Sequence, residues 1–256
     1  MHQRLALLPL LLALLAVSAC DDGPTSPTAN SSTGTAGPTP AATTATLRST
    51  RFLAFGDSLT EGEVTSPTAG TSVSPSVVVS RSSYPAVLQD RLRARYTAQA
   101  GQVTVTNGGR SGELVAAAAP RLGQLLANSQ TEVLLLLDGY NDLLDYGAGG
   151  VSPAIDAMNV LAQEGRHRGA RVFIGLLPPP IAGRQRSVPD AVVRAFNDQL
   201  RAVAAGEGAV VVDTYTALSA DPARYIGVDG HHPNEAGYQR IAEEFLVQIA
   251  ANLENR

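Results

Sequence analysis

The stretch RFLAFGDSL, residues 51–59, joins a short apolar run to a polar turn. Arg51 to Phe55 has the large apolar residues of a strand that is buried on both faces of a parallel sheet. Ser58 follows the end of this predicted strand. Because ligands of open α/β sheets bind at the carboxyl ends of the strands, Ser58 is a candidate functional residue.

From this stretch to the C-terminus, short apolar runs alternate with longer amphipathic segments. This alternation is typical of a parallel sheet with helices on both faces. The predicted strands are 51–55, 103–106, 133–137, 172–177 and 210–213, and the predicted helices are 84–96, 113–126, 153–168, 188–204 and 233–252. An insertion at 64–82, rich in Ser, Thr, Pro and Val, either covers the site beside Ser58 or forms a surface excursion.

The N-terminal segment has the composition of an export signal. Residues 1–19 contain an apolar run from Leu5 to Val17, shorter than the ~20 residues of a membrane-spanning helix, and end in small residues before Cys20. This ending resembles a bacterial lipoprotein signal, which implies lipidation of Cys20 and anchoring in the cell envelope, facing the periplasm or the exterior. An ordinary signal peptide with an incidental cysteine is the alternative.

The segment 20–48 is expected to be a flexible tether. It consists mainly of Thr, Ser, Ala, Pro and Gly, which cannot bury enough apolar surface to offset the entropy of ordering. The remainder, 49–256, is long enough for one domain with a substantial core. Cys20 is the only cysteine, so no disulfide can form within one copy of the chain.

Four polar clusters follow the predicted strands. They are Gly-Asp-Ser at 56–58, Asn-Gly-Gly-Arg-Ser-Gly-Glu at 107–113, Asp-Gly-Tyr-Asn-Asp at 138–142 and Asp-Gly-His-His-Pro at 229–233. A serine hydroxyl becomes a good nucleophile when an imidazole takes its proton and a carboxylate fixes the imidazole tautomer. All three residue types are present in these clusters.

In order and spacing, the clusters resemble the four sequence blocks of the SGNH hydrolases, also called the GDSL esterase and lipase family. The resemblance extends from Arg51 to the C-terminus. It implies a three-layer α/β/α sandwich with a five-stranded parallel sheet in the flavodoxin-like order 2-1-3-4-5. It also implies serine-dependent hydrolysis of acyl esters without a cofactor.

The family roles transfer to this chain block by block. The resemblance implies that Ser58 is the nucleophile, His232 the base and Asp229 its carboxylate partner. It further implies oxyanion donors at the backbone of Ser58 and Gly112 and at the amide of Asn141. In the predicted strand order, these three donors follow adjacent strands. Leu114 stands where many relatives have threonine.

Several residues have alternative interpretations. Ser58 with Glu61 matches a capping box, so the serine could simply begin a helix. Asp213 ends a strand and is a rival acid. His231 is a rival base, but its spacing is wrong, and it is expected at the rim. His232 is expected at the start of the last helix.

Asp57 and Asp142 are expected to make local hydrogen bonds that hold the loops. Tyr140 is a candidate substrate contact or a packing residue.

Composition and residue types also limit the partners. The formal net charge of −4 argues against nucleic acid or an anionic membrane surface as the main partner. No metal is expected, because only the adjacent His231 and His232 are plausible imidazole ligands and adjacent side chains rarely converge on one ion. The expected partners are an acyl ester substrate and, through the anchor, a membrane, with the protein a monomer.

Two other functions stay open. One is a catalytically degenerate protein that binds lipid or glycan on the same fold, and the other is a carbohydrate acetylesterase. The chain has no Trp and few other aromatic residues, which favours simple esters over glycans.

Overall fold

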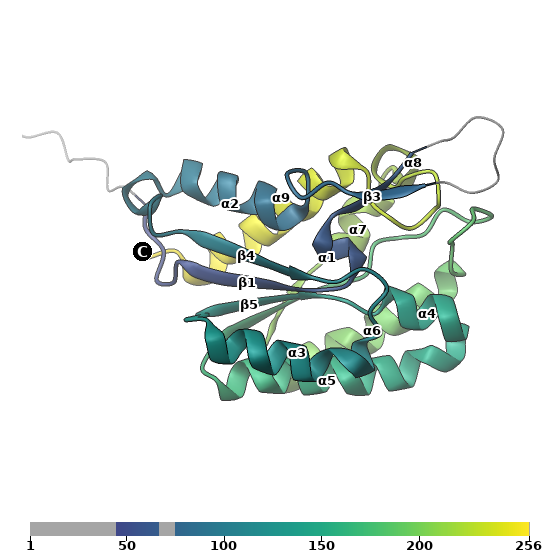
Figure 1. The fold of residues 1–256 in the computed structure, drawn as a ribbon, viewed down its shortest axis with the longest axis horizontal. Coiled ribbons are helices and arrows are strands. Elements are labelled where there is room, and N and C mark those ends of the chain that lie inside the picture. The colour runs from purple at the N-terminus through teal and green to yellow at the C-terminus, as the bar shows by residue number, and fades with distance from the viewer. Residues whose placement is uncertain (1–44, 67–74, 256) are drawn as a thin grey trace, which may run out of the picture. The chain divides into compact units, whose positions relative to one another are not determined.

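Five parallel strands form the central sheet in the order β4-β1-β5-β6-β7 (Figure 1). The computed structural model describes residues 45–66 and 75–255, and Cys20 and the predicted signal lie outside them. The strands of the sheet are β1 (Arg51–Gly56), β4 (Thr104–Gly109), β5 (Val133–Leu137), β6 (Arg171–Gly175) and β7 (Val210–Val212). Numbered along the chain within this sheet, the order is 2-1-3-4-5. The predicted fold class and strand order are therefore confirmed.

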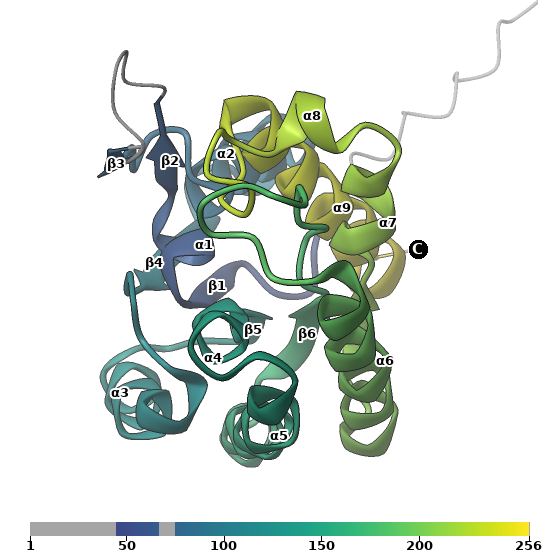
Figure 2. The ribbon, with the colours of Figure 1, turned by 90° about the vertical axis from the view of Figure 1, so that its right-hand side faces the viewer.

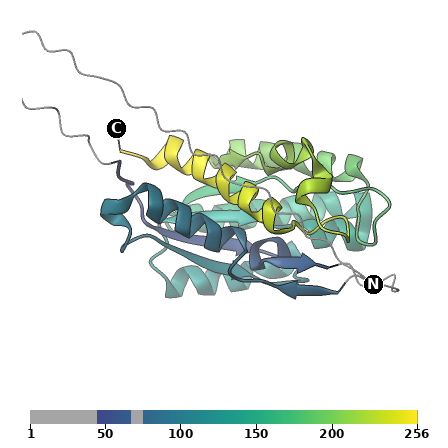
Figure 3. The same ribbon diagram turned by 90° about the horizontal axis from the view of Figure 1, so that it is seen from above.

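Helices cover both faces of the sheet (Figures 1 and 2). One face carries α2 (Tyr84–Arg95), α7 (Thr214–Ser219), α8 (Pro222–Tyr225) and α9 (Glu235–Leu253), and the other carries α3 (Val115–Asn128), α5 (Val151–His167) and α6 (Asp190–Glu207). The short elements are α1 (Ser58–Glu61), α4 (Tyr140–Tyr146), η1 (Thr97–Gln99) and η2 (Gly147–Gly150). From above, the yellow α9 lies beside the blue α2 (Figure 3).

The core forms where apolar side chains of the sheet meet those of the helices. All residues of β5, Val-Leu-Leu-Leu-Leu, are buried, because this strand has neighbours on both sides and helices over both faces. Helix α3 buries Val115, Ala118, Leu122 and Leu126, which lie on one stripe of the helix. The apolar runs and stripes seen in the sequence therefore build this core.

The chain enters the domain beside the end of α9. Leu47 is buried, its N–H donates to Gln99 Oε1 at 2.6 Å, and it forms a β-bridge with Glu254. Packing thus begins slightly before the predicted boundary at residue 49.

Part of the insertion forms a second, two-stranded sheet (Figure 2). Strands β2 (Glu63–Thr65) and β3 (Ser76–Val78) pair antiparallel. The Tyr238 hydroxyl of α9 donates to the Glu63 carbonyl at 2.6 Å, and a Cβ added at Gly227 would lie 2.6 Å from Thr65 Oγ1. Strand β2 therefore lies against the loop that leads to Asp229, not away from the domain.

Candidate active site

Ser58 is the first residue of α1, directly after β1. The N-cap of α1 is Asp57, whose Oδ1 accepts the Leu59 N–H at 2.9 Å, so the capping-box interpretation of Ser58 is wrong. At the preceding Gly56, a Cβ would lie 1.9 Å from the Leu137 carbonyl oxygen. Glycine at position 56 thus lets β1 end close to β5. Because Asp57 caps α1, the Ser58 side chain is not used as a cap.

His232 joins Ser58 to Asp229 through its two ring nitrogens. Its Nε2 lies 2.9 Å from Ser58 Oγ, and its Nδ1 lies 2.6 Å from Asp229 Oδ2. All three side chains are buried. These contacts suit the tautomer in which Nδ1–H donates to the carboxylate while Nε2 accepts the serine proton.

The loop that carries this pair is held by backbone contacts. Asp229 Oδ1 accepts the N–H groups of His231 and His232, each at 3.2 Å, and the Gly227 N–H donates to the His232 carbonyl at 2.7 Å. The segment after β6 braces the loop from outside, since the Arg186 N–H donates to the Asp229 carbonyl at 2.9 Å. The positions of both side chains thus depend on segments distant in sequence.

The predicted start of the last helix is wrong. Helix α9 begins at Glu235, because the Asn234 side chain accepts the Gly237 N–H at 3.0 Å and caps the helix. His232 therefore precedes the N-cap and lies in the loop.

The carboxyl group of Asp229 is stabilised in its ionised form. Burial by itself would raise its pKa, but the hydrogen bond to His232 and the proximity of His231 and His232 outweigh burial and lower the pKa to about 2. Asp229 is therefore a carboxylate at neutral pH.

The three predicted oxyanion donors follow adjacent strands, β4, β1 and β5. Gly112 has a φ of +76° in an exposed turn, a backbone conformation that favours glycine. Asn141 lies in the first turn of α4, and its Nδ2 donates to the Glu113 carbonyl at 3.1 Å. Glu61 Oε2, from the helix of Ser58, accepts the Ser111 N–H at 2.6 Å. Side-chain hydrogen bonds thus connect all three loops.

A buried ion pair supports the ends of β1 and β4. Arg121 of α3 pairs with Glu113 and donates to the Gly56 carbonyl at 3.2 Å. Its guanidinium group also lies over the Phe55 ring, 4.0 Å from the centroid. The arginine therefore links the end of β1, just before Ser58, to the loop after β4.

Sequence reasoning missed Glu63. Its carboxylate Oε1 lies 3.7 Å from His232 Nε2 and 3.6 Å from the guanidinium of Arg186, and its side chain is nearly buried. Glu63 stands just before the insertion at 64–82, and no motif there signalled it. It reaches the site only because β2 packs against the Asp229 loop.

His231 is not at the rim, and that prediction is wrong. Its side chain is 1% exposed, and its ring lies between Tyr140, at 4.4 Å between centroids, and His232, at 3.7 Å. Neither ring nitrogen has a hydrogen-bond partner among the described residues. Tyr140 is buried as well, so it packs under the histidines and not against solvent.

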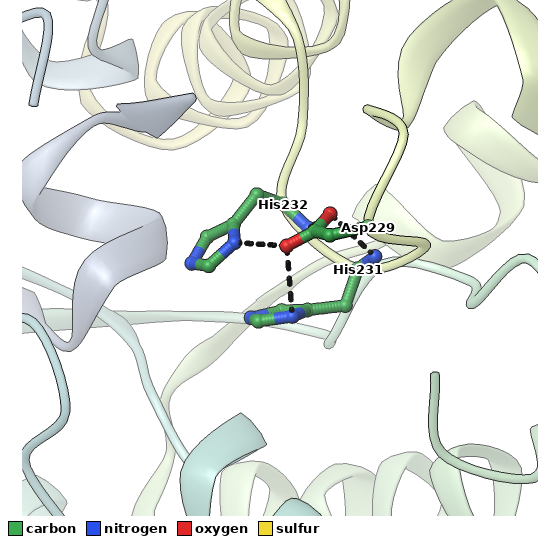
Figure 4. Close-up of side chains that lie close together, drawn as sticks. All are labelled: Asp229, His231 and His232. Carbon is green, nitrogen blue, oxygen red and sulfur yellow. Dashed lines mark hydrogen bonds and ion pairs between the residues drawn. The ribbon is translucent and has the colours of Figure 1, made fainter. Parts of the chain in front are cut away.

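Figure 4 shows Asp229, His231 and His232 close together, with dashed lines from the Asp229 carboxylate to both histidines. One potential ligand atom from each residue lies within 4.8 Å of the other two. The two adjacent imidazole rings pack against each other, with centroids 3.7 Å apart, and both lie near the same carboxylate. The absence of a resident metal stays a prediction.

The other acidic candidates have local roles. Asp213 caps α7 by accepting the Thr216 N–H at 2.9 Å and pairs with Arg201, so it is not the partner of His232. Asp142 Oδ2 accepts the Val115 N–H at 3.1 Å, and Asp57 caps α1. Both make the local hydrogen bonds predicted for them.

Buried carboxyl groups also lie behind Ser58. Burial raises the pKa of Asp57 to about 6, although the Leu59 N–H and the proximity of His232 oppose the shift. Burial and the neighbouring Asp57 raise the pKa of Asp138 well above its usual range. One carboxylate oxygen of each residue has no hydrogen bond.

Comparison with solved structures identifies the fold. The chain matches a lipase/acylhydrolase from Enterococcus faecalis with a TM-score of 0.64 and 20% identity, over 81% of this chain and 99% of that one. It matches the carbohydrate acetylesterase Est24 from Sinorhizobium meliloti with a TM-score of 0.64 and 17% identity, over 79% and 99% of the two chains. It matches the psychrotrophic esterase EstA from Pseudoalteromonas sp. with a TM-score of 0.60 and 19% identity, over 79% of this chain and 98% of that one.

The architecture is thus that of the SGNH hydrolases. The chain belongs to the GDSL-like lipase/acylhydrolase family, whose model matches residues 54–240. No curated protein sequence matches it significantly. Within 45–66 and 75–255, no helix has the length and apolar character needed to cross a membrane.

Proposed function

We propose that this protein hydrolyses acyl esters, with Ser58 as nucleophile, His232 as general base and Asp229 as the group that orients the imidazole. The observation that supports this most strongly is the continuous contact from Ser58 Oγ through His232 to Asp229, at 2.9 and 2.6 Å. An ionised Asp229 favours the His232 tautomer that can accept the serine proton.

In the first step, Ser58 Oγ attacks the ester carbonyl while its proton moves to His232 Nε2. The tetrahedral intermediate collapses when His232 returns this proton to the leaving alcohol, which leaves an acyl group on Ser58. Water then enters, loses a proton to the same nitrogen and releases the acid. Asp229 stabilises the imidazolium formed in each half of the reaction.

Oxyanion stabilisation is assigned to the backbone N–H groups of Ser58 and Gly112 and to the amide of Asn141. The amide of Asn141 has two N–H donors, of which one is needed for the Glu113 carbonyl, so the second is available to the oxyanion. Each such donor contributes about 3–4 kcal/mol to lowering the barrier.

Glu63 lies on the side of His232 where the proton is exchanged. A carboxylate 3.7 Å from Nε2 stabilises an imidazolium more than a neutral imidazole, and its ion pair with Arg186 moderates this effect. Glu63 therefore assists proton acceptance, and it disfavours an anionic leaving group at the same place.

A pocket of about 480 Å³ borders the proposed oxyanion loops, and it is mostly apolar. Its lining residues include Leu114, two positions after Gly112, and Asp142, next to Asn141, together with Tyr146 and Pro153. An apolar pocket lined by sequence neighbours of Gly112 and Asn141 suits an acyl chain and supports simple acyl esters as substrates.

The test is hydrolysis of a chromogenic short-chain ester by the purified protein. Ser58→Ala is expected to abolish turnover, whereas Ser152→Ala, at an exposed position on α5, is expected to retain it. Wild-type turnover by Ser58→Ala would refute the proposal. A panel of acyl lengths and acetylated sugars then defines the substrate, including the carbohydrate acetylesterase alternative.

A degenerate binding protein on this fold is the competing function. Labelling by a fluorophosphonate probe separates the two, since the probe requires an activated serine. We expect labelling at Ser58 that is lost in His232→Ala. No labelling of the wild-type protein would favour the binding function.

We further propose that the protein is an envelope lipoprotein anchored through lipidated Cys20, monomeric, and acting on substrates outside the cytoplasm. The small residues before Cys20 and the polar segment after it support this. Cys20→Ser is expected to move the protein from the membrane fraction to the soluble fraction. Unchanged fractionation would contradict the anchor.

A further inference from the structure

Arg121 of α3 bonds to the backbone at the ends of two neighbouring strands. Its guanidinium group donates to the carbonyl of Gly56, at the end of β1, at 3.2 Å and to the carbonyl of Gly108, near the end of β4. The side chain is 13% exposed, and its Nε lies 2.9 Å from Glu113 Oε2. A planar guanidinium group can make these contacts together because its donors point in fixed directions. Arg121 thus holds β1, β4 and Glu113 in one arrangement.

The turn that carries Gly112 is tied at both ends to the carbonyl of Gly56, directly and through Arg121. At its start, the Arg110 N–H donates to the Gly56 carbonyl at 3.0 Å. At its end, Glu113 pairs with Arg121, which donates to that carbonyl as well. The Glu113 N–H closes the turn by donating to the Arg110 carbonyl at 3.3 Å. Because Gly56 ends the strand before the proposed nucleophile, these contacts fix the direction of the Gly112 N–H relative to it.

Glu113 connects the same arginine to Asn141. The carbonyl of Glu113 accepts a hydrogen bond from Asn141 Nδ2 at 3.1 Å, and the side chains of both residues are buried. A side-chain amide is planar, so a partner for one of its N–H groups fixes where the other points. The position of Glu113 therefore decides the direction of the free donor of Asn141.

We propose that Arg121 is a positioning residue that aligns the oxyanion donors of Gly112 and Asn141 with Ser58. It acts through Glu113 and the Gly56 carbonyl, not through the substrate. This role rests on the proposed function, in which these donors stabilise the tetrahedral intermediate.

Loss of Arg121 should weaken stabilisation of the transition state and leave the titration of the base unchanged. The partners of Arg121 lie on β1 and on or just after β4, whereas His232 and Asp229 come from the loop between α8 and α9. The pH dependence of kcat, which reports the titration of the base, should therefore keep its midpoint. An arginine with a purely structural role would instead lower the free energy of unfolding and leave kcat of the folded protein unchanged.

The first experiment compares steady-state ester hydrolysis by Arg121→Met and the wild-type protein. Methionine keeps an unbranched chain beside the Phe55 ring but removes the charge and every N–H donor. We expect kcat to fall by about 10², the effect of losing one oxyanion donor, with KM and the midpoint of the pH profile unchanged. A kcat within about threefold of the wild-type value, or a shifted midpoint, would overturn the proposal.

Arg93→Met is the matched control. Arg93 is also half-buried, and its Nε donates to the Val103 carbonyl at 3.0 Å, next to the opposite end of β4. This variant should keep the wild-type kcat. An equal loss of kcat in both variants would show that any weakening of β4 lowers activity, and the proposal would fail.

A double-mutant cycle tests whether Arg121 acts through Asn141. Asn141→Ala should lower kcat by about 10² to 10³ in the wild-type background. In the Arg121→Met background the same change should cost at least about tenfold less, because the amide is already misaligned. Fully additive losses would overturn this route.

A separate measurement follows the Asn141 side chain without using activity. By NMR, the Nδ2–H that bonds to the Glu113 carbonyl should exchange with solvent at least about tenfold faster in Arg121→Met than in the wild-type protein. The amide of Asn252, bonded to the Gln248 carbonyl at 2.9 Å, is the internal reference. Equal exchange of the Asn141 amide in the two proteins would overturn the proposal. If Arg121→Met fails to fold, Arg121→Lys, which keeps the charge but not the planar fork, replaces it in every measurement.

An inactive wild-type protein in which the Asn141 amide still depends on Arg121 would refute the proposed function and leave the positioning of the amide intact. An active esterase in which neither kcat nor the Asn141 amide responds to loss of Arg121 would do the reverse.

Discussion

Two groups of buried aspartates near Ser58 have pKa values that are shifted in opposite directions. Asp229, between the histidines, has a pKa lowered to about 2. Asp57 and Asp138, behind the serine, have raised pKa values, that of Asp57 reaching about 6. All three side chains are fully buried, so burial alone does not explain the difference.

The partners of each carboxylate account for the contrast. Asp229 Oδ1 accepts two backbone N–H groups, and Oδ2 contacts the His232 ring. Asp57 and Asp138 each accept one short backbone hydrogen bond and leave Oδ2 unpaired, and the proximity of Asp57 raises the pKa of Asp138. The first arrangement keeps a carboxylate charged for use at neutral pH, while the second makes ionisation unfavourable.

The largest expected effect comes from removing the charge of Asp229, the carboxylate beside the histidines. Asp229→Asn should lower kcat by about 10⁴, because an amide does not hold the His232 tautomer that accepts a proton. The fold should persist, since an amide oxygen can still accept the N–H groups of His231 and His232. Steady-state kinetics and urea denaturation test both parts. A kcat within tenfold of wild type would show that the low pKa of Asp229 serves structure alone.

Asn141 lies between Asp138 and Asp142 in the sequence. Its substitution tests whether the loop that bears these two carboxyl groups takes part in catalysis. Asn141→Ala should lower kcat by about 10² to 10³, because one oxyanion donor is lost. Asn252→Ala is the matched control, since it also removes one hydrogen bond from a side-chain amide to a backbone carbonyl, but on the far part of α9. Equal kinetics for the two variants would remove Asn141 from the oxyanion site.

Asp57→Asn should raise stability at neutral pH, whereas Asp229→Asn should not. A raised folded-state pKa means that Asp57 favours folding below its unfolded pKa of about 3.9, and that this contribution is lost as pH rises to about 6. The substitution abolishes this dependence and keeps an acceptor for the Leu59 N–H. At pH 8 the unfolding free energy should therefore increase, by at most about 3 kcal/mol.

Urea denaturation at pH 4 and pH 8 measures this difference, with the exposed Asp198→Asn as control. Parallel pH profiles for wild type and Asp57→Asn would mean that Asp57 ionises normally.

The smallest expected effect is at Tyr140, where the two regions meet. Its buried hydroxyl has no hydrogen bond, so Tyr140→Phe should leave the unfolding free energy unchanged or raise it by about 1 kcal/mol. The ring, and with it the support under His231, is preserved. A clear loss of stability in thermal denaturation would reveal a partner for the hydroxyl, and a large rise in KM would restore Tyr140 as a substrate contact.

Much of the sheet could be predicted because its strands are continuous apolar runs. The prediction for β5 matched at both ends, and the polar clusters marked where the strands finish. Helix starts were less predictable. Pro233 is a common first helical residue, but the side chain of Asn234 forms the cap and moves the start of α9 to Glu235. Several neighbouring residues can act as the N-cap of a helix, and composition does not show which of them does.

The sequence by itself determined the strand order, through its resemblance to a known family, and the residues that follow each strand. Whether a histidine is buried depends on what covers it, and here Tyr140, about 90 positions away in the chain, covers His231. The tertiary structure likewise decided that Glu63 lies beside His232 and that Asp57 and Asp229 have opposite pKa shifts. These properties arise from distances between segments remote in sequence, and a one-dimensional pattern does not contain those distances.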